Sequence, residues 1–185
     1  MSGLIFAFLA VLVSGLGARD QVLVAQLASR QGRHPVALML ALASAMGTSA
    51  LAAWAAVALA PRMNGDARLF FAALALALAG LEVVFARASR APAEPTHSLG
   101  AFVLVLLAQQ LTDAARFLVL AVALATRAPI AAGAGGAAAS VAVVLIGWLG
   151  GEALVRRSFG APRRVIGALV LLVALGLGLR AMGRL

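Results

Sequence analysis

The sequence contains no cysteine, no tyrosine and no lysine. Without cysteine, the chain can form neither a disulfide nor a thiolate metal site. Acidic residues are also scarce: six stand against fifteen arginines, and charged residues together make up 11% of the chain. Soluble domains carry about a quarter charged residues, whereas 64% of this chain is hydrophobic. The composition therefore predicts an integral membrane protein whose main partner is the lipid bilayer.

The net charge of +9 comes from arginines distributed among the short segments between apolar runs. A nucleic-acid interface would gather them on one face, so we expect no nucleic-acid partner. They are instead typical of topology determinants and of contacts to lipid phosphates. Loops one, three and five carry eight of them, and the opposite side carries five. This bias predicts that loops one, three and five are cytoplasmic and that both termini lie outside. We expect the membrane to be the bacterial inner membrane.

Six prolines separate six apolar segments, and none of them lies inside an apolar run. A helix of about 20 residues crosses the hydrocarbon core of a bilayer, so each segment is long enough to span it. We therefore predict an all-α membrane protein with six transmembrane helices. The predicted helices cover residues 3–29, 36–60, 68–87, 99–126, 130–154 and 164–182.

The two halves of the sequence resemble each other when one is shifted by about 95 residues. "GLGARDQVLV" (15–24) then lies on "QLTDAARFLV" (110–119), and "PVALMLALASA" (35–45) lies on "PIAAGAGGAAA" (129–139). Each copy contains three predicted helices, and an odd number places the two copies in opposite orientations. We predict two inverted repeats, 1–90 and 99–185, joined by a cytoplasmic linker at 91–98. Inverted repeats are typical of secondary transporters, whose substrate sites lie between the repeats.

Both copies place polar residues within their first helix. The first copy has Arg19, Asp20 and Gln21 there, and the second has Gln110, Thr112, Asp113 and Arg116, beside Gln109. Asp113 lies about 21 Å along a helix that starts near residue 99, which is close to the middle of a bilayer. Intramembrane charges favour a functional site, although a neutral set of this kind can also act only as polar contacts between helices.

Two arginines and two aspartates sum to zero charge here, so pairing among them is feasible. Asp113 and Arg116 are three residues apart on one helical face, which favours a local pair. Arg19 and Asp113 can pair across the interface between the repeats. Gly15 and Gly17 would loosen the first helix at this point and let another backbone approach.

The other polar residues give weaker indications of a functional site. Glu82 is expected near the membrane interface, balanced by a following arginine, although a place on a proton path stays open. Glu152 and Arg156 are spaced for an ordinary helical ion pair. "GAGGAAAS" (133–140) predicts a small-residue helix face for close packing. No nucleophile and base occur together within the apolar segments, so we expect neither an enzyme nor a cofactor.

The first helix of each copy resembles that of the Gdt-type cation/proton exchanger family, the transmembrane protein 165 family, whose motif is E-x-G-D-[KR]-[ST]. In the first copy, Gly17 and Arg19 match this motif, and in the second copy Asp113 matches its aspartate. Gly15 and Gln110 stand where the family has glutamate. The resemblance extends over nearly the whole chain through the helix count and the second helices that begin at proline.

The resemblance implies an antiporter that moves Mn²⁺ or Ca²⁺ against protons. Asp113 is then the candidate cation, metal or proton ligand, because dications of this kind prefer carboxylate oxygens. Neighbouring polar groups would come from Gln110, Thr112, Asp20 and Gln21, with Arg19 and Arg116 balancing the charge. Two alternatives stay open: a non-transporting scaffold or regulatory protein whose exchanger site has decayed, and a transporter of an anionic or zwitterionic solute.

Overall fold

The computed structural model describes residues 1–30, 34–85, 98–157 and 159–184, and every regular element in these ranges is helical. The predicted all-α membrane class is confirmed. The predicted linker at 91–98 lies outside the described residues except for Ser98, whose hydroxyl caps the following helix. The helices are α1 (Ser2–Gly15), α2 (Arg19–Arg30), α3 (Pro35–Leu59), η1 (Ala60–Arg62), α4 (Gly65–Phe85), α5 (Leu99–Leu111), α6 (Ala114–Thr126), α7 (Pro129–Val155) and α8 (Gly160–Ala181).

Four helical stretches are each long and apolar enough to cross a membrane: α3 with η1, α4, α7 and α8. Two further candidates are bent pairs, α1 with α2 at 58° and α5 with α6 at 46°. The described part of the chain therefore has four candidate spans, or up to six if each bent pair is one span. Four of the predicted segments correspond to single helices within a few residues, whereas the first and fourth are broken.

The break between α1 and α2 follows from its backbone conformation. Leu16 is extended, and Gly17 has a φ of +73°, in the left-handed region that glycine adopts without a Cβ penalty. The prediction that glycine loosens the first helix at this position is confirmed. The break between α5 and α6 has a different cause: Thr112 leaves the helical region and Asp113 is extended, with φ −86° and ψ 150°.

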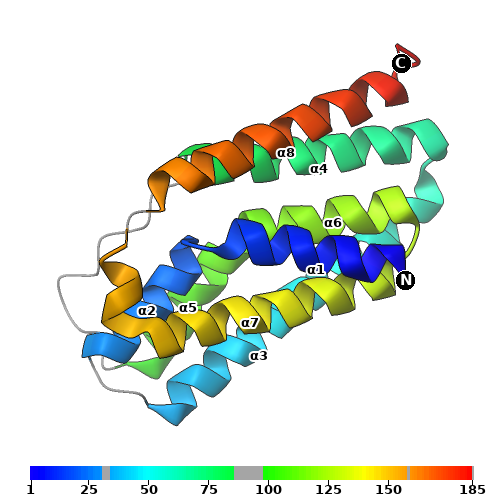
Figure 1. Cartoon of the computed structure of the whole chain (residues 1–185). Helices are drawn as coiled ribbons and strands as arrows, with labels where there is room; N and C mark the ends of the chain where they lie inside the picture. Colours follow the sequence, from blue (N-terminus) through cyan, green and yellow to red (C-terminus); the bar gives the residue numbers. More distant parts are fainter. Residues whose placement is uncertain (31–33, 86–97, 158, 185) are drawn as a thin grey trace.

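Small residues let the helices approach closely. On α7, "GAGGAAAS" forms the predicted close-packing face, because Gly135 lies directly against the backbone of α1 and Gly136 against Val119 of α6. Gly80 of α4 and Gly167 of α8 pack against each other's carbonyl groups. These contacts hold α4 and α8 side by side and place α7 against α1 (Figure 1).

Replacing Gly135 by alanine is expected to destabilise the protein by about 1–3 kcal/mol, the usual cost of overpacking a tight interface. The added β-carbon would overlap the carbonyl group of Leu4, which belongs to the backbone of α1 and cannot rotate away. Gly47→Ala is the matched control, since nothing lies within 4 Å of its β-carbon position. Thermal unfolding of the detergent-solubilised variants measures the difference. Equal midpoints for the two variants would contradict the close α1–α7 packing.

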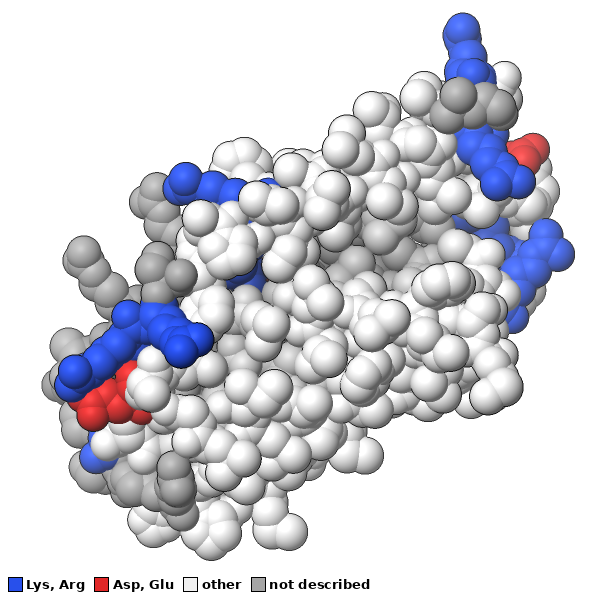
Figure 2. Space-filling view, in the orientation of Figure 1, with Lys and Arg blue, Asp and Glu red and all other residues white. Residues whose placement is uncertain are grey.

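Charge is concentrated at the two ends of the molecule. On the face shown in Figure 2, arginines gather at both ends and the surface between them is almost uncharged. Large apolar side chains are exposed along the helices, including Leu169, Leu172 and Leu175 of α8 at 58–65% exposure. Such a surface is suited to lipid rather than water. The start of α1 and the end of α8 lie at the same end of the molecule (Figure 1).

Candidate functional site

The two helix breaks meet inside the helical bundle. Residues from both breaks line one small space, to which the first break contributes Asp20 and the second contributes Asp113 and Arg116. Each of these three residues is at most 5% exposed. The space between them is too small for a water molecule in this conformation. The predicted convergence of the two polar segments is thus present for these three residues.

Two carboxylates and a single guanidinium line this space, so its lining has one more acidic than basic group. The predicted ion pair between Arg116 and Asp113 forms, with Nη1 3.8 Å from Oδ2. This distance is too long for a hydrogen bond. Asp20 has no basic partner within 4 Å among the residues that the structure describes, and one of its oxygens accepts the backbone N–H of Gln21 at 2.8 Å. A buried excess of acidic groups favours a proton or a cation beside it.

Arg116 is held mainly by α3 rather than by Asp113. Its Nε and Nη2 donate to Thr48 Oγ1 at 2.9 and 2.6 Å, and Nη2 also reaches the carbonyl of Ala45 at 3.4 Å. Thr48 is one turn away from Ser44, which donates to Gln110 Oε1 at 2.5 Å. A chain of polar contacts therefore links the α5–α6 break to one face of α3.

The remaining predicted site residues lie beside this space with different roles. Gln21 is completely buried and pins the first break, because its Oε1 accepts the Gly17 N–H at 2.7 Å and its Nε2 donates to Val143 of α7 at 3.2 Å. Gln110 is equally buried, and its Nε2 has no hydrogen-bond partner in the described structure. Thr112 is exposed, and its backbone carbonyl accepts from Arg19 Nη2 at 3.2 Å. Both glutamines and Thr112 thus hold the breaks in place.

Arg19 does not pair with Asp113, and this prediction is wrong. Its Nε lies 3.3 Å from Glu82 Oε1 of α4, and the other carboxylate oxygen lies 3.3 Å from Arg163 Nη2 of α8. The Glu82 side chain is 8% exposed. Glu82 was expected to be balanced by a following arginine, Arg87, which lies outside the described residues; within them its partners are Arg19 and Arg163. Because α4 packs against α8, Glu82 lies inside the bundle and pairs with Arg163 of α8.

Arg163 also contacts the first break directly. Its Nη1 donates to the carbonyl oxygens of Ser14 and Leu16 at 3.0 and 3.3 Å. These groups stand where α1 ends, and the last carbonyls of a helix carry partial negative charge. A buried guanidinium thus occupies the negative end of α1 and is neutralised on its other side by Glu82. We refer to Arg19, Glu82 and Arg163 as the arginine–glutamate triad.

Sequence reasoning missed three residues of this region, Arg163, Ser44 and Thr48, and named Glu82 without placing it beside the first break. Glu82 gave a usable signal, since a single carboxylate within an apolar helix is usually functional or paired. Ser44 and Thr48 are four apart and so share a helix face, but hydroxyl residues of this kind are common in membrane helices. Arg163 gave no signal, because it follows a proline and stands next to a second arginine, as loop residues do.

The described residues do not provide a complete ligand set for a dication. No group of three or more His, Asp or Glu side chains comes together in the ranges that the structure covers. Asp20 and Asp113 would have to be supplemented by neutral oxygens such as those of Ser140, which lines the same space. The predicted pair of Glu152 and Arg156 does form at 2.6 Å, but it is exposed and remote from this region.

Comparison with known proteins adds no assignment: no protein-family model, no curated protein sequence and no solved structure matches this chain.

Proposed function

We propose that this chain is a membrane transporter of small ions and a divergent member of the Gdt-type cation/proton exchanger family. The observation that carries the proposal is the shared space between the two helix breaks. Carboxylates from both breaks, Asp20 and Asp113, face this space with only one guanidinium between them. Ionisable groups at helix breaks inside a membrane protein are typical of ion pathways.

The architecture that we propose is six membrane spans in two inverted three-helix repeats. In each half, a bent pair is followed by a long helix that begins at proline and then by another long helix. Three spans in each half would turn the second half over relative to the first. Six spans would also return the chain to its starting side, which agrees with α1 beginning and α8 ending at the same end (Figure 1).

The proposed mechanism uses the excess of acidic groups between the breaks. A proton on either carboxylate would neutralise it, and a cation that enters would displace that proton. Arg116 stays fixed on Thr48 during this exchange, so its charge sets how strongly the space attracts a cation. In the conformation described here the space is too small for a water molecule, so transport requires the two breaks to separate. Alternating access of this kind moves one repeat against the other around a fixed site.

The test is ion flux into proteoliposomes under an imposed pH gradient. We expect wild-type protein to move Mn²⁺ or Ca²⁺ and Asp113→Asn to reduce the flux to the level of protein-free vesicles. The substitution keeps the size of the side chain and removes the titratable charge. Asp66→Asn is the matched control, because Asp66 is an exposed carboxylate in the first turn of α4, and it should transport like the wild type.

Two outcomes would contradict the proposal. If wild-type protein shows a folded circular dichroism spectrum but its vesicles show no ion flux, the non-transporting scaffold is favoured. Flux that survives Asp113→Asn would remove Asp113 from the site.

A second candidate function, transport of an anionic or zwitterionic solute, is favoured by the buried Arg163, which brings a third arginine to the breaks. Proton-driven uptake of an amino or organic acid without cation flux would support it.

A further inference from the structure

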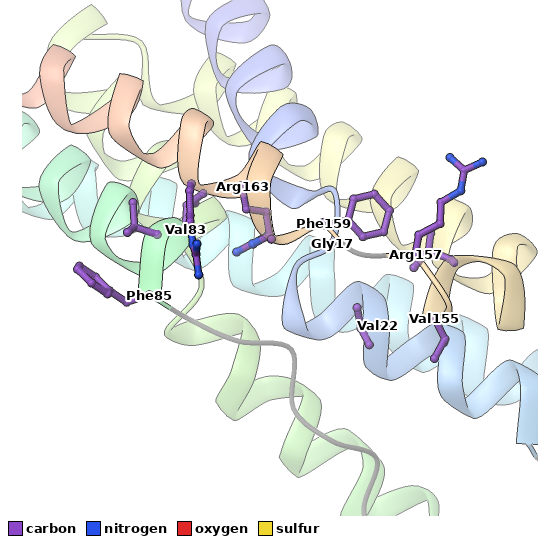
Figure 3. A pocket seen from close by; sticks show the side chains of 12 residues that line it. Gly17, Val22, Val83, Phe85, Val155, Arg157, Phe159 and Arg163 are labelled. Carbon is purple, nitrogen blue, oxygen red and sulfur yellow. The ribbon is translucent and has the colours of Figure 1, made fainter.

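A second cavity lies where the connection between α7 and α8 meets the α1–α2 break. It has a volume of about 450 Å³, within the range of about 300–1,000 Å³ that is usual for small-molecule sites. Figure 3 shows Arg163 extending from the first turn of α8 toward the break, with Phe159 beside Gly17. The proposed ion site between the breaks is lined by other residues, so this cavity is a separate feature.

The lining of the cavity combines positive charge with an apolar wall. Among the described residues, Arg157, Arg163 and Arg164 line it, and no carboxylate does. Val22, Val83 and Leu154 form part of the apolar wall. A ligand that matches both the arginines and the apolar wall would have an anionic head and a hydrocarbon portion. The head would contact the arginines, because arginine binds phosphate and carboxylate oxygens well.

Arg163 is the anchored arginine of the cavity, and Glu82 is its ion-pair partner. Its side chain is 7% exposed, and both terminal nitrogens are held by Glu82 and by the end of α1. Its Nε is buried and has no hydrogen-bond partner among the described residues. Arg157 and Arg164 are exposed and form no ion pair with any residue in the described ranges. Arg157 stands at the rim with its guanidinium turned outward (Figure 3). The site thus has one anchored arginine and two that are free to close on an anion.

The position of the cavity indicates where such a ligand comes from. It lies where the apolar helices α4 and α7 end and α8 begins. If these helices span the membrane, this is the level at which lipid head groups lie. Basic pockets between membrane helices at this level bind the head groups of anionic lipids.

We propose that this cavity binds a phosphate group that carries a hydrocarbon chain, supplied by an anionic phospholipid of the surrounding membrane. The phosphate contacts the arginines, and the start of the acyl region lies along the apolar wall. The same chemistry is available from a free phosphate in solution, so the test separates the two sources.

The test measures retention of lipid by the purified full-length chain, using native mass spectrometry in detergent. Phosphatidylglycerol and phosphatidylcholine with identical acyl chains are offered separately, and inorganic phosphate is added as a third arm. We expect saturable binding of phosphatidylglycerol in preference to phosphatidylcholine. Arg157→Gln combined with Arg164→Gln should weaken this binding about thirtyfold, as expected from the loss of two arginines near a lipid phosphate.

The matched control combines Arg156→Gln with Arg180→Gln, which removes the same charge from exposed positions that do not line the cavity. This control should bind phosphatidylglycerol like the wild type. An uncharged variant, Val155→Trp, fills the cavity from its wall and should also lose binding, whereas Val165→Trp, on the exposed face of α8, should not. These two tests keep the charge effect and the cavity effect apart.

Each outcome decides the proposal. If both arginine double variants lose phosphatidylglycerol binding, the lipid follows net charge alone, and the proposal is overturned. If the wild type retains phosphatidylglycerol and phosphatidylcholine equally, the lipid follows hydrophobicity alone, and the proposal is overturned as well. Binding of inorganic phosphate that displaces the lipid and is lost in the same cavity variants would support the site and assign its ligand to solution. None of these outcomes depends on whether the chain transports ions.

Discussion

Glu82→Gln is expected to lower the free energy of unfolding by about 3–5 kcal/mol, the usual cost of removing one partner from a buried ion pair. Glutamine keeps the size of the side chain but removes the only negative charge in the triad. Arg19 and Arg163 would then be left as like charges on either side of a neutral amide. The measurement is unfolding of the detergent-solubilised protein by titration with a denaturing detergent, followed by circular dichroism.

Glu152→Gln is the matched control for this prediction, because it makes the same chemical change in a shorter ion pair. Glu152 and Arg156 are 2.6 Å apart but 67% and 77% exposed, whereas the contacts of Glu82 are longer and buried. Water already solvates the exposed pair, so its loss should not change stability measurably. A second substitution, Arg163→Met, added to Glu82→Gln should recover part of the stability by removing one stranded charge. Equal, small losses in both glutamine variants would show that the triad is not a buried ion-pair cluster.

Gly17→Ala is expected to destabilise the protein by about 2–5 kcal/mol, from two separate causes. The first is the backbone, since a φ of +73° is unfavourable for any residue with a β-carbon. The second is the contact with Phe159, whose Cβ and Cγ would lie 2.5 and 2.6 Å from the new methyl group. The helix break would therefore have to open, or Phe159 would have to leave its place beside the cavity.

Gly183→Ala separates these two causes. Gly183 has a similar φ of +66°, but nothing lies within 4 Å of its β-carbon position. It should therefore show the backbone cost alone, about 1–2 kcal/mol at most. Thermal unfolding and phosphatidylglycerol retention are measured for both variants. If Gly17→Ala were no more destabilising than Gly183→Ala, the packing of Phe159 on the break would not contribute to stability.

The helical segments could be predicted from the sequence because they depend on local properties, whereas the breaks that divide the first and fourth segments were not predicted. Hydrophobic runs bounded by proline determine where a membrane helix begins and ends, and α3, α4, α7 and α8 match these runs within a few residues. Glycine beside charged residues indicated that the first helix is loosened, and Gly17 is where its backbone turns; the full separation into α1 and α2 was not predicted. The i,i+3 pair of Asp113 and Arg116 was predicted from helical spacing and does form, although Asp113 is extended and stands just before the first residue of α6.

The partners of the charges could not be predicted, because they depend on which helices pack together. Glu82 and Arg163 are 81 residues apart, and they meet because Gly80 and Gly167 let α4 and α8 approach at that level. The sequence alone equally favoured a pair of Arg19 with Asp113, which the position of α4 prevents. Local periodicity contains no information about such contacts.

The membrane environment, the helical class and the positions of the polar groups along the chain all follow from the order of the amino acids. They depend on composition and on the cost of placing charge in hydrocarbon, which act on each segment separately. The division of three arginines and three carboxylates into the arginine–glutamate triad and an acidic space between the breaks depends instead on how the helices pack. That division depends on the close approach of small residues on neighbouring helices, which fixes the few ångströms that decide which charges pair.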